Sequence, residues 1–375
     1  MNHHFPVKKA GKPRVLVAPL DWGLGHATRC IPLVRELILQ GAEVWLAAEG
    51  TQASLLKEEF PGLSLLELKG YRVKYAKTAR GLIWQMFRQW PRLRRIVREE
   101  HQWLLEQTAL HGFDAVISDN RYGLYHPNIP SVFITHQLLI RSPLGKWTES
   151  ILQKSNYRYI NRFKECWVPD LPGHPNLAGV LSHPEKKPAT ALVYTGPLTR
   201  FTFQGTEEKK KHLLILLSGP EPQRSLLENI IIDQISHYPG TATVVRGLPG
   251  HAQMIPSTGM IRFYNHLTAE ELQKEIEKAS LVICRSGYST VMDLAALQKK
   301  CFFIPTPGQT EQEYLAGYAR ENGWAPYVLQ DEFDLNRVLE TAAGFSYQPF
   351  PEANKNWLQG AVGRFLHQLS GTALG

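Results

Sequence analysis

Cysteine is scarce in this sequence. The 375 residues include four cysteines, and none pairs as Cys-x-x-Cys. That spacing argues against a structural zinc site and is typical of a reduced, cytosolic protein. Long apolar runs are also missing, since no stretch reaches the roughly 18–20 residues of a membrane-spanning helix. The polar N-terminus lacks the pattern of a secretory signal, so we expect a cytoplasmic protein.

The sequence also lacks two motifs, and their absence argues against two classes of enzyme chemistry. The turn "DWGLGHATR" contains Gly23 and Gly25 but no third glycine where the dinucleotide fingerprint has one, which argues against an NAD-dependent oxidoreductase. No carboxylates stand together as Asp-x-Asp, so we expect neither a required metal nor a bound cofactor. The net charge of +8 favours acidic partners such as nucleotide phosphates or anionic lipid. No recognised module supports nucleic-acid binding.

Short apolar runs alternate with helical patterns in two blocks. Strands alternating with helices predict crossover units and parallel sheets, so the expected fold class is α/β, with two Rossmann-like domains facing across a cleft. The polar segment 199–212 is predicted to be a linker between an N-terminal domain, 1–198, and a C-terminal domain, 213–350. The predicted strands are 14–20, 42–49, 63–68, 113–119, 131–137, 165–170 and 191–198, then 213–219, 242–248, 261–267, 281–284 and 301–306.

The stretch "CRSGYSTVMDLAALQKKCFFIPTPGQTEQ", residues 284–312, gathers small and polar residues at the ends of two apolar strands. Gly287 would permit a sharp turn, and free N–H groups of the helix that follows would form an anion site suited to phosphate. Asp293, about one turn further on, could accept hydrogen bonds from a ribose. Thr290 and Asp293 also fit a capping box, which needs no ligand, and spacing alone does not decide between these interpretations.

This stretch resembles the donor-binding segment of the MurG-type UDP-N-acetylglucosaminyltransferases, and it is similar to segments of the UDP-glucuronosyltransferases. The resemblance implies the GT-B fold and sugar transfer from a nucleotide, with a C-terminal helix, within 351–375, that crosses back to the first domain. Two departures are Asp293, where Glu is commoner, and Leu315, where Asn is usual. The implied donor-binding residues are Ser218, Gly219, Arg246, His266, Leu267, Arg285, Ser286, Gly287, Thr290, Asp293, Gln309, Glu311 and Gln312.

The turn after the first strand supplies candidate catalytic residues. A histidine at the mouth of a cleft can act as a general base, although position alone favours a capping or exposed role for His26. The resemblance favours catalysis, because Gly-His recurs at this turn in the superfamily. Asp119 ends a predicted buried strand and would orient His26 or act as the base itself. Gly23, Gly25 and His136 are assigned to the acceptor side.

The segment 71–98 combines nine Lys or Arg residues with no acidic residue. Its apolar residues recur at helical spacing, a pattern typical of a helix lying in a membrane interface or of an ordinary helix with a basic face. Relatives that glycosylate lipids use such a patch, so the resemblance favours a lipid-linked acceptor and a peripheral site on the inner face of an anionic membrane.

The expected reaction is inverting glycosyl transfer from a UDP-sugar to a hydroxyl. Two alternatives stay open on the sequence: a sugar-nucleotide epimerase on the same fold, and a non-catalytic protein that binds sugar nucleotides. The epimerase would need extra carboxylates in the cleft, and the binding protein would bind the donor without turnover.

Overall fold

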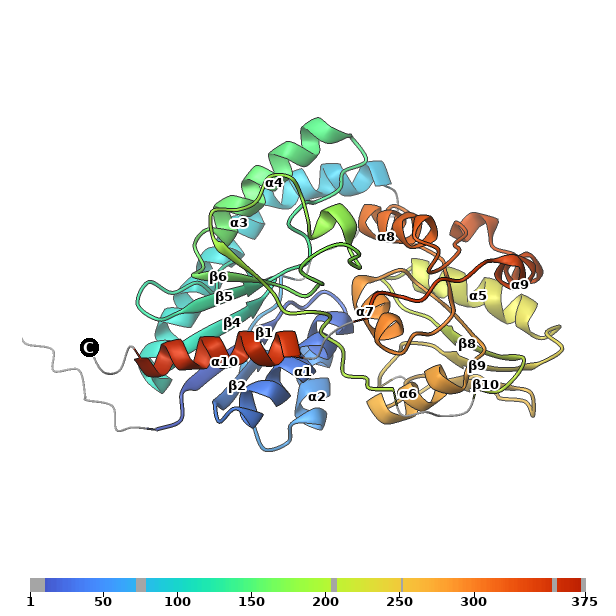
Figure 1. Cartoon of the computed structure of the whole chain (residues 1–375), viewed down its shortest axis with the longest axis horizontal. Helices are drawn as coiled ribbons and strands as arrows, with labels where there is room; N and C mark the ends of the chain where they lie inside the picture. The colour runs from blue at the N-terminus through green and yellow to red at the C-terminus, as the bar shows by residue number, and fades with distance from the viewer. Residues whose placement is uncertain (1–10, 72–78, 204–207, 251, 353–355, 372–375) are drawn as a thin grey trace, which may run out of the picture.

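The computed structural model describes residues 11–71, 79–203, 208–250, 252–352 and 356–371, and the side chains of these residues apart from 79–91 and 371. Figure 1 shows two α/β units side by side, each built on one parallel sheet with helices on its faces. This is the predicted fold class. None of the helices within these ranges is long and apolar enough to cross a membrane.

The first sheet is a doubly wound sheet of seven parallel strands in the order β3-β2-β1-β4-β5-β6-β7. The strand order reverses between β1 and β4, and ligands of such sheets bind beyond the carboxyl ends of the strands at this switch point. The strands are β1 Arg14–Pro19, β2 Glu43–Ala48, β3 Ser64–Glu67, β4 Ala115–Asp119, β5 Ser131–Ile134, β6 Glu165–Val168 and β7 Ala191–Tyr194.

The second sheet has five parallel strands in the order β10-β9-β8-β11-β12, with its switch point between β8 and β11. Its central strands are almost fully buried because helices cover both faces, and this explains their nearly continuous apolar sequence. The strands are β8 His212–Leu216, β9 Thr241–Val245, β10 Ile261–Tyr264, β11 Leu281–Cys284 and β12 Cys301–Phe303.

The helices connect these strands. A capping box starts α6: the Thr268 side chain accepts from the Glu271 amide, and the Glu271 side chain accepts from the Thr268 amide. The helices α2, α4 and α9 were not predicted from the sequence. In α4 the buried positions are occupied by the polar residues Glu149, Gln153 and Asn156, so its sequence lacks the helical periodicity of apolar residues. The helices are α1 Leu24–Leu39, α2 Gly50–Glu59, α3 Ala79–His111, α4 Lys146–Ile160, α5 Gln223–Ile235, α6 Ala269–Lys278, α7 Tyr288–Ala296, α8 Thr310–Glu321, α9 Leu335–Gly344 and α10 Asn356–Gly371, with 3-10 turns η1 Gly179–Leu181 and η2 Gln330–Glu332.

The last helix, α10, lies against the first unit rather than the second (Figure 1). The Gln40 side-chain amide donates to the Gln359 carbonyl at 2.9 Å, and the rings of Trp167 and Phe365 meet edge to face with centroids 5.5 Å apart. The chain therefore starts and ends on the same unit, and crosses between the two units twice.

The segment that joins the units differs from the prediction of a polar linker over 199–212. His212 is the first residue of β8, and Leu198 and Phe201 are buried with exposures of 2% and 3%. The Gln273 side-chain amide donates to the Thr202 carbonyl, which fixes the segment to α6. Residues 204–207 lie outside the described residues. The first part of the segment is thus packed, because Leu198 and Phe201 enter the core, although Phe203 is exposed.

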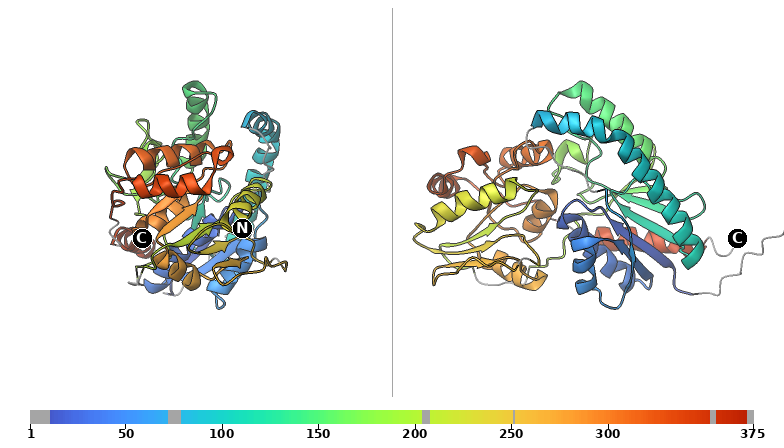
Figure 2. Two further views of the ribbon diagram at one scale, coloured as in Figure 1. Left: turned by 90° about the vertical axis from the view of Figure 1, so that its right-hand side faces the viewer. Right: turned by 180° about the vertical axis from the view of Figure 1, so that it is seen from behind.

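Of the basic segment 71–98, the structure describes the backbone of α3 from Ala79 and the side chains of Tyr71 and 92–98. The remaining side chains of the predicted membrane-binding pattern lie outside the described residues. Figure 2 shows α3 and α4 rising together from the first unit, to one side of its sheet.

Candidate active site between the two sheets

The carboxyl ends of the two sheets meet where α7 and α8 of the second unit face the first unit. The Ser289 hydroxyl, in the first turn of α7, donates to the Gly25 carbonyl at 3.1 Å. His136, just beyond β5, contacts Glu311 in the first turn of α8, with 2.7 Å between Nε2 and Oε1. Gly25 and His136 of the first unit and Glu311 of the second, all predicted site residues, therefore meet at one interface.

Glycine is favoured at two positions of the first turn, for a different structural reason at each. Gly23 has a φ of +71°, a left-handed conformation that favours glycine, and α1 begins at the next residue. At Gly25 a Cβ atom would lie 2.9 Å from the Ser289 hydroxyl, so glycine allows the second unit to approach. His26 consequently lies in the first turn of α1. The sequence predicted that His26 stands in the turn between strand and helix, because the apolar helical pattern starts at Cys30. That prediction was wrong, since α1 begins six residues earlier, at Leu24.

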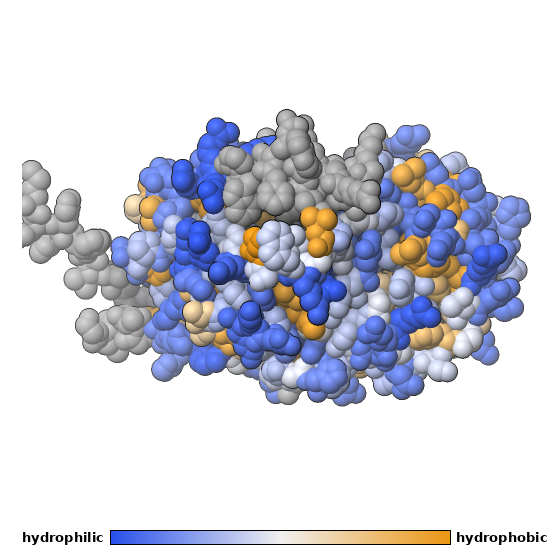
Figure 3. Space-filling model, turned by 90° about the horizontal axis from the view of Figure 1, so that it is seen from above, coloured by the Kyte–Doolittle hydropathy of each residue, from blue (hydrophilic) through white to orange (hydrophobic). Residues whose placement is uncertain are grey.

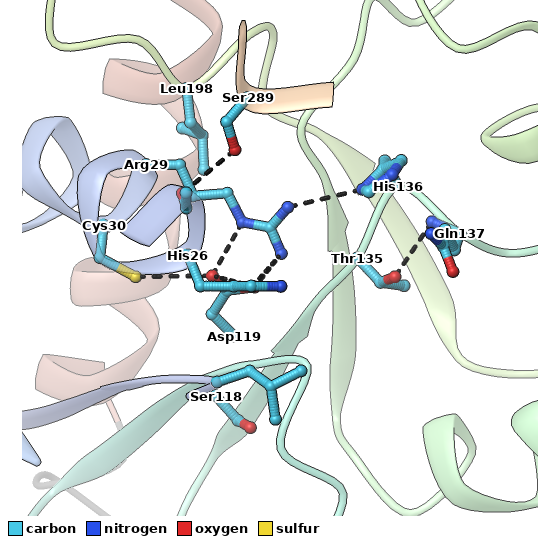
Figure 4. A network of polar contacts seen from close by, with 12 residues as sticks. His26, Arg29, Cys30, Ser118, Asp119, Thr135, His136, Gln137, Leu198 and Ser289 are labelled. Atoms are coloured by element: carbon cyan, nitrogen blue, oxygen red, sulfur yellow. Dashed lines mark hydrogen bonds and ion pairs between the residues drawn. The ribbon is translucent and has the colours of Figure 1, made fainter. Parts of the chain in front are cut away.

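Partly exposed His26, with 15% of its side chain accessible, and fully buried Asp119 form a pair that is completed by Arg29. The His26 Nδ1 atom lies 3.1 Å from Asp119 Oδ2, and Arg29 Nε donates to the same oxygen at 2.8 Å. The second guanidinium nitrogen of Arg29 donates to Asp119 Oδ1 and lies 2.9 Å from His26 Nδ1. Figure 4 shows Arg29 between Asp119 and His136. The spacing of one helical turn places Arg29 on the same face of α1 as His26.

The charges of this cluster are set by burial and by Arg29. Burial lowers the pKa of His26, the Arg29 charge lowers it further, and Asp119 raises it in part. Burial alone would raise the pKa of Asp119, but Arg29 and His26 outweigh burial and hold it well below its usual value. Asp119 is therefore a carboxylate at neutral pH, and it fits the role of orienting His26 better than that of a base.

A second group joins the two units directly. Both carboxylate oxygens of Glu311 are bonded by the first unit, one by His136 and the other by the side-chain amide of Gln137. The His136 ring stacks on Tyr288 with centroids 4.1 Å apart, and the Tyr288 hydroxyl donates to the Pro169 carbonyl at 2.7 Å. Burial raises the pKa of Glu311, but His136 and Arg29 lower it by more, so this group is also a carboxylate.

The start of α7 is open to a ligand. Gly287 is the N-cap residue with φ −67°, and no side chain caps the helix. The capping-box interpretation of Thr290 and Asp293 was wrong, because the helix begins at Tyr288 and both residues lie inside it. The prediction that Gly287 permits a sharp turn was wrong as well. Its backbone is in the extended region, which any residue can adopt. A Cβ atom there would contact only Gln312, at 4.0 Å, so the glycine leaves free space beside the helix.

Asp293 contacts the segment that joins the units. The Thr199 hydroxyl donates to Asp293 Oδ1 at 2.6 Å. Asp293 is only partly exposed, and burial raises its pKa to about 6, although Thr199 and Arg200 lower it. The Arg200 side chain is 6% exposed, its Nε atom is buried without a hydrogen bond, and the carboxylate of Glu59 lies 3.8 Å from its Nη1 atom.

Three predicted donor-binding residues mainly hold the protein together. Four of the five N–H groups of Arg246 are bonded, to Glu228, Asn265 and the Gln253 carbonyl. Arg285 is 1% exposed, and its terminal nitrogens donate to carbonyls of the loop after β12 and of Gln223, the first residue of α5. Its burial lowers its pKa to about 10. The Ser286 hydroxyl donates to the backbone carbonyl of Gln312 at 2.8 Å.

The other predicted residues lie at the carboxyl edge of the second sheet. Gln312 accepts from the Thr306 amide at 2.8 Å and donates to Gln309, so it shapes the loop before α8. Ser218 and Gly219 follow β8 and are exposed, and Gly219 has a φ of +106°. His266 is half-buried, and burial, followed by the charge of Arg200, lowers its pKa. Leu267 is 6% exposed and belongs to the core.

Sequence reasoning missed Arg29, Gln137, Thr199 and Arg200. Arg29 could have been found, because it stands three residues after His26 and directly before the predicted helical pattern. The other three are brought to the site by loops, and no periodic pattern marks them. Among the described residues, no group of three or more His, Cys, Asp or Glu side chains is arranged to hold a metal ion.

Comparison with known proteins agrees with this geometry. Residues 261–362 match the glycosyltransferase family 28 C-terminal domain. The UDP-N-acetylglucosamine--N-acetylmuramyl-(pentapeptide) pyrophosphoryl-undecaprenol N-acetylglucosamine transferase of Salmonella arizonae is 23% identical over 342 residues, which cover 90% of each chain.

Solved structures share the fold at low identity. A glycosyltransferase of kitacinnamycin has a TM-score of 0.61 and 14% identity, and the match covers 96% of each chain. The MurG of Acinetobacter baumannii has a TM-score of 0.52 and 14% identity, covering 96% of this chain and 99% of that one.

The protein is therefore a nucleotide-sugar glycosyltransferase with the GT-B fold. More narrowly, it contains a glycosyltransferase family 28 C-terminal domain and is a distant homologue of the MurG transferases, and that family implies a sugar-nucleotide donor.

Proposed function

We propose that this protein transfers a sugar from a UDP-sugar to a hydroxyl acceptor, with inversion and without a required metal. The observation that carries the proposal is the pair of partly exposed His26 and buried Asp119 at the carboxyl edge of the first sheet, opposite the uncapped start of α7. A base and an anion site then face each other across the interface between the units.

His26 is proposed as the general base. When its Nδ1–H donates to the Asp119 carboxylate, the lone pair of Nε2 is free to accept the proton of the acceptor hydroxyl. The hydroxyl oxygen forms a bond to the anomeric carbon while the bond to the leaving diphosphate breaks. The lowered pKa of His26 keeps the ring neutral, as a base must be before the reaction.

The diphosphate is proposed to lie at the N-terminus of α7. Its backbone N–H groups and the helix dipole stabilise the charge that develops on the leaving group, and fixed donors of this kind are worth about 3–4 kcal/mol in other enzymes. Arg200 is a further donor on this side of the site, because an oxygen of the nucleotide would supply the hydrogen bond that its buried Nε atom lacks. Asp293 is assigned to the ribose, and Gln309 and Glu311 to the hydroxyls of the transferred sugar.

The acceptor is proposed to be a lipid-linked hydroxyl presented at the inner face of an anionic membrane. On α4, Trp147 and Ile151 are one turn apart with exposures of 76% and 49%, and Leu144 just before the helix is 58% exposed. Lys146 and Lys154 are exposed on the same helix. In the view from above, Figure 3 shows a few apolar side chains near the middle of the face, among hydrophilic ones, and others at its right-hand end. Aromatic and aliphatic side chains flanked by lysines suit a membrane interface.

The test is transfer from UDP-N-acetylglucosamine, UDP-glucose and UDP-galactose to lipid extracts in detergent, followed by mass spectrometry. We expect a product from one donor, loss of turnover by at least 100-fold in His26→Asn, and unchanged UDP affinity in that variant. Donor binding without any transfer would support the non-catalytic alternative. An epimerised donor without an acceptor product would support the epimerase.

A further inference from the structure

The segment that joins the two units contacts the carboxylate that is assigned to the ribose. Thr199 belongs to neither sheet, yet its hydroxyl makes the single hydrogen bond that the Asp293 carboxylate receives within the described part of the chain. Its distance of 2.6 Å is in the range of a hydrogen bond to a charged oxygen.

The direction of this hydrogen bond is fixed by a second one. The Thr199 hydroxyl accepts from the Phe201 amide at 3.1 Å. A hydroxyl has one hydrogen to donate, and here that hydrogen is left for the Asp293 carboxylate, which can only accept. Thr199 therefore acts as a donor to Asp293 Oδ1, while Oδ2 keeps its capacity to accept.

The backbone around Thr199 is held on both sides. Leu198 and Phe201 are buried in the core, and the Leu198 amide lies 3.3 Å from the sulfur of Met292, the neighbour of Asp293 in α7. On the other side, Gln273 of α6 bonds Thr202. These contacts place the hydroxyl at α7 before any ligand binds, so the bond to Asp293 does not depend on a flexible linker.

We propose that Thr199 is a positioning residue of the donor site, whose hydroxyl holds one oxygen of Asp293 so that the other oxygen accepts from the ribose hydroxyls of the nucleotide. This inference depends on the proposed function, because it takes Asp293 to be the ribose ligand.

The surrounding charges agree with this role. Arg200 is the cation beside Asp293, Glu59 of α2 and Arg35 of α1 stand behind Arg200, and half-buried His266 lies beside it. Burial raises the pKa of Asp293, and the Thr199 hydrogen bond lowers it. Without that bond, Asp293 would be protonated at a higher pH and would accept less well.

The test is calorimetric titration with UDP and with 2′,3′-dideoxy-UDP, which lacks both ribose hydroxyls. At pH 7 we expect Thr199→Val to weaken UDP binding roughly tenfold, which corresponds to about 1.4 kcal/mol. Thr199→Ser should restore wild-type affinity, and 2′,3′-dideoxy-UDP should bind the wild type and Thr199→Val equally. The loss in Thr199→Val should also shrink at pH 9, where Asp293 is ionised in both proteins. Thr51→Val, at an exposed threonine of α2, is the matched control.

The outcomes separate the two proposals. Unchanged UDP affinity in Thr199→Val, or an equal loss for UDP and 2′,3′-dideoxy-UDP, would overturn the positioning role while leaving the donor site intact. If instead Asp293→Asn binds UDP as the wild type does, or the wild type binds no UDP, the assignment of the donor site is itself wrong. The pH comparison is made relative to Asp293→Asn, because the phosphates of UDP also titrate.

Discussion

Replacing Asp119 by asparagine should separate the structural part of the His26 cluster from its chemical part. Asp119 is fully buried and Arg29 is 2% exposed, so the substitution leaves a buried guanidinium without its counter-ion. Removing one partner of such a pair typically costs about 3–5 kcal/mol of the free energy of unfolding. For a unit of roughly 200 residues, at about 2–4 °C per kcal/mol, the unfolding midpoint should fall by roughly 6–20 °C.

The activity of Asp119→Asn should fall further than its stability explains. At a temperature where the variant is folded, we expect kcat to drop by about 100-fold or more, because the base loses the group that orients it. UDP affinity should change little, since Asp119 belongs to the first unit. Differential scanning calorimetry, initial rates and UDP titration measure the three quantities.

A double variant provides the control. Replacing both members of a buried ion pair by apolar residues is often neutral or stabilising, so Arg29→Met with Asp119→Leu should recover much of the lost stability but none of the activity. The reasoning would be refuted if Asp119→Asn unfolded at the wild-type temperature, since the pair would then not be a buried one. Full activity in the double variant would refute the role of Asp119 in the chemistry.

Three further predictions concern pH, the contact between the units and the membrane. Burial and the Arg29 charge lower the pKa of His26 from 6.5, so kcat/KM should fall only below pH 6.5. Arg29→Gln should raise the pKa of His26 and move this fall in kcat/KM to higher pH. Glu311→Gln removes the ion pair to His136; it should raise the KM for the donor severalfold and the radius of gyration by small-angle scattering, whereas the exposed Glu321→Gln should do neither. Trp147→Ser should weaken binding to anionic vesicles in a sedimentation assay, and unchanged binding would contradict the proposed membrane face.

The sequence alone determined the architecture. Fully buried parallel strands must be apolar on both faces, so each strand was visible as a short apolar run, with ends that moved by a few residues in the structure. The edge that carries the site followed from the same logic, because Asp119 ends one strand and Gly287 closely follows another. The resemblance of 284–312 indicated the chemistry. Glycines and a histidine marked the first turn, although the start of α1 was placed too late.

The tertiary structure decided which polar groups act together. Gln137 and Thr199 carry no periodic signal, and Asp119, the charged partner of Arg29, is 90 residues away from it in the chain. The structure also showed that Arg246 and Arg285 are largely occupied by internal hydrogen bonds, which spacing cannot reveal. Periodicity reports which face of an element is buried, whereas the partner of a buried charge depends on how the two sheets meet. For that reason the sequence could predict the edge, and only the folded chain could assemble His26, Arg29 and Asp119 there.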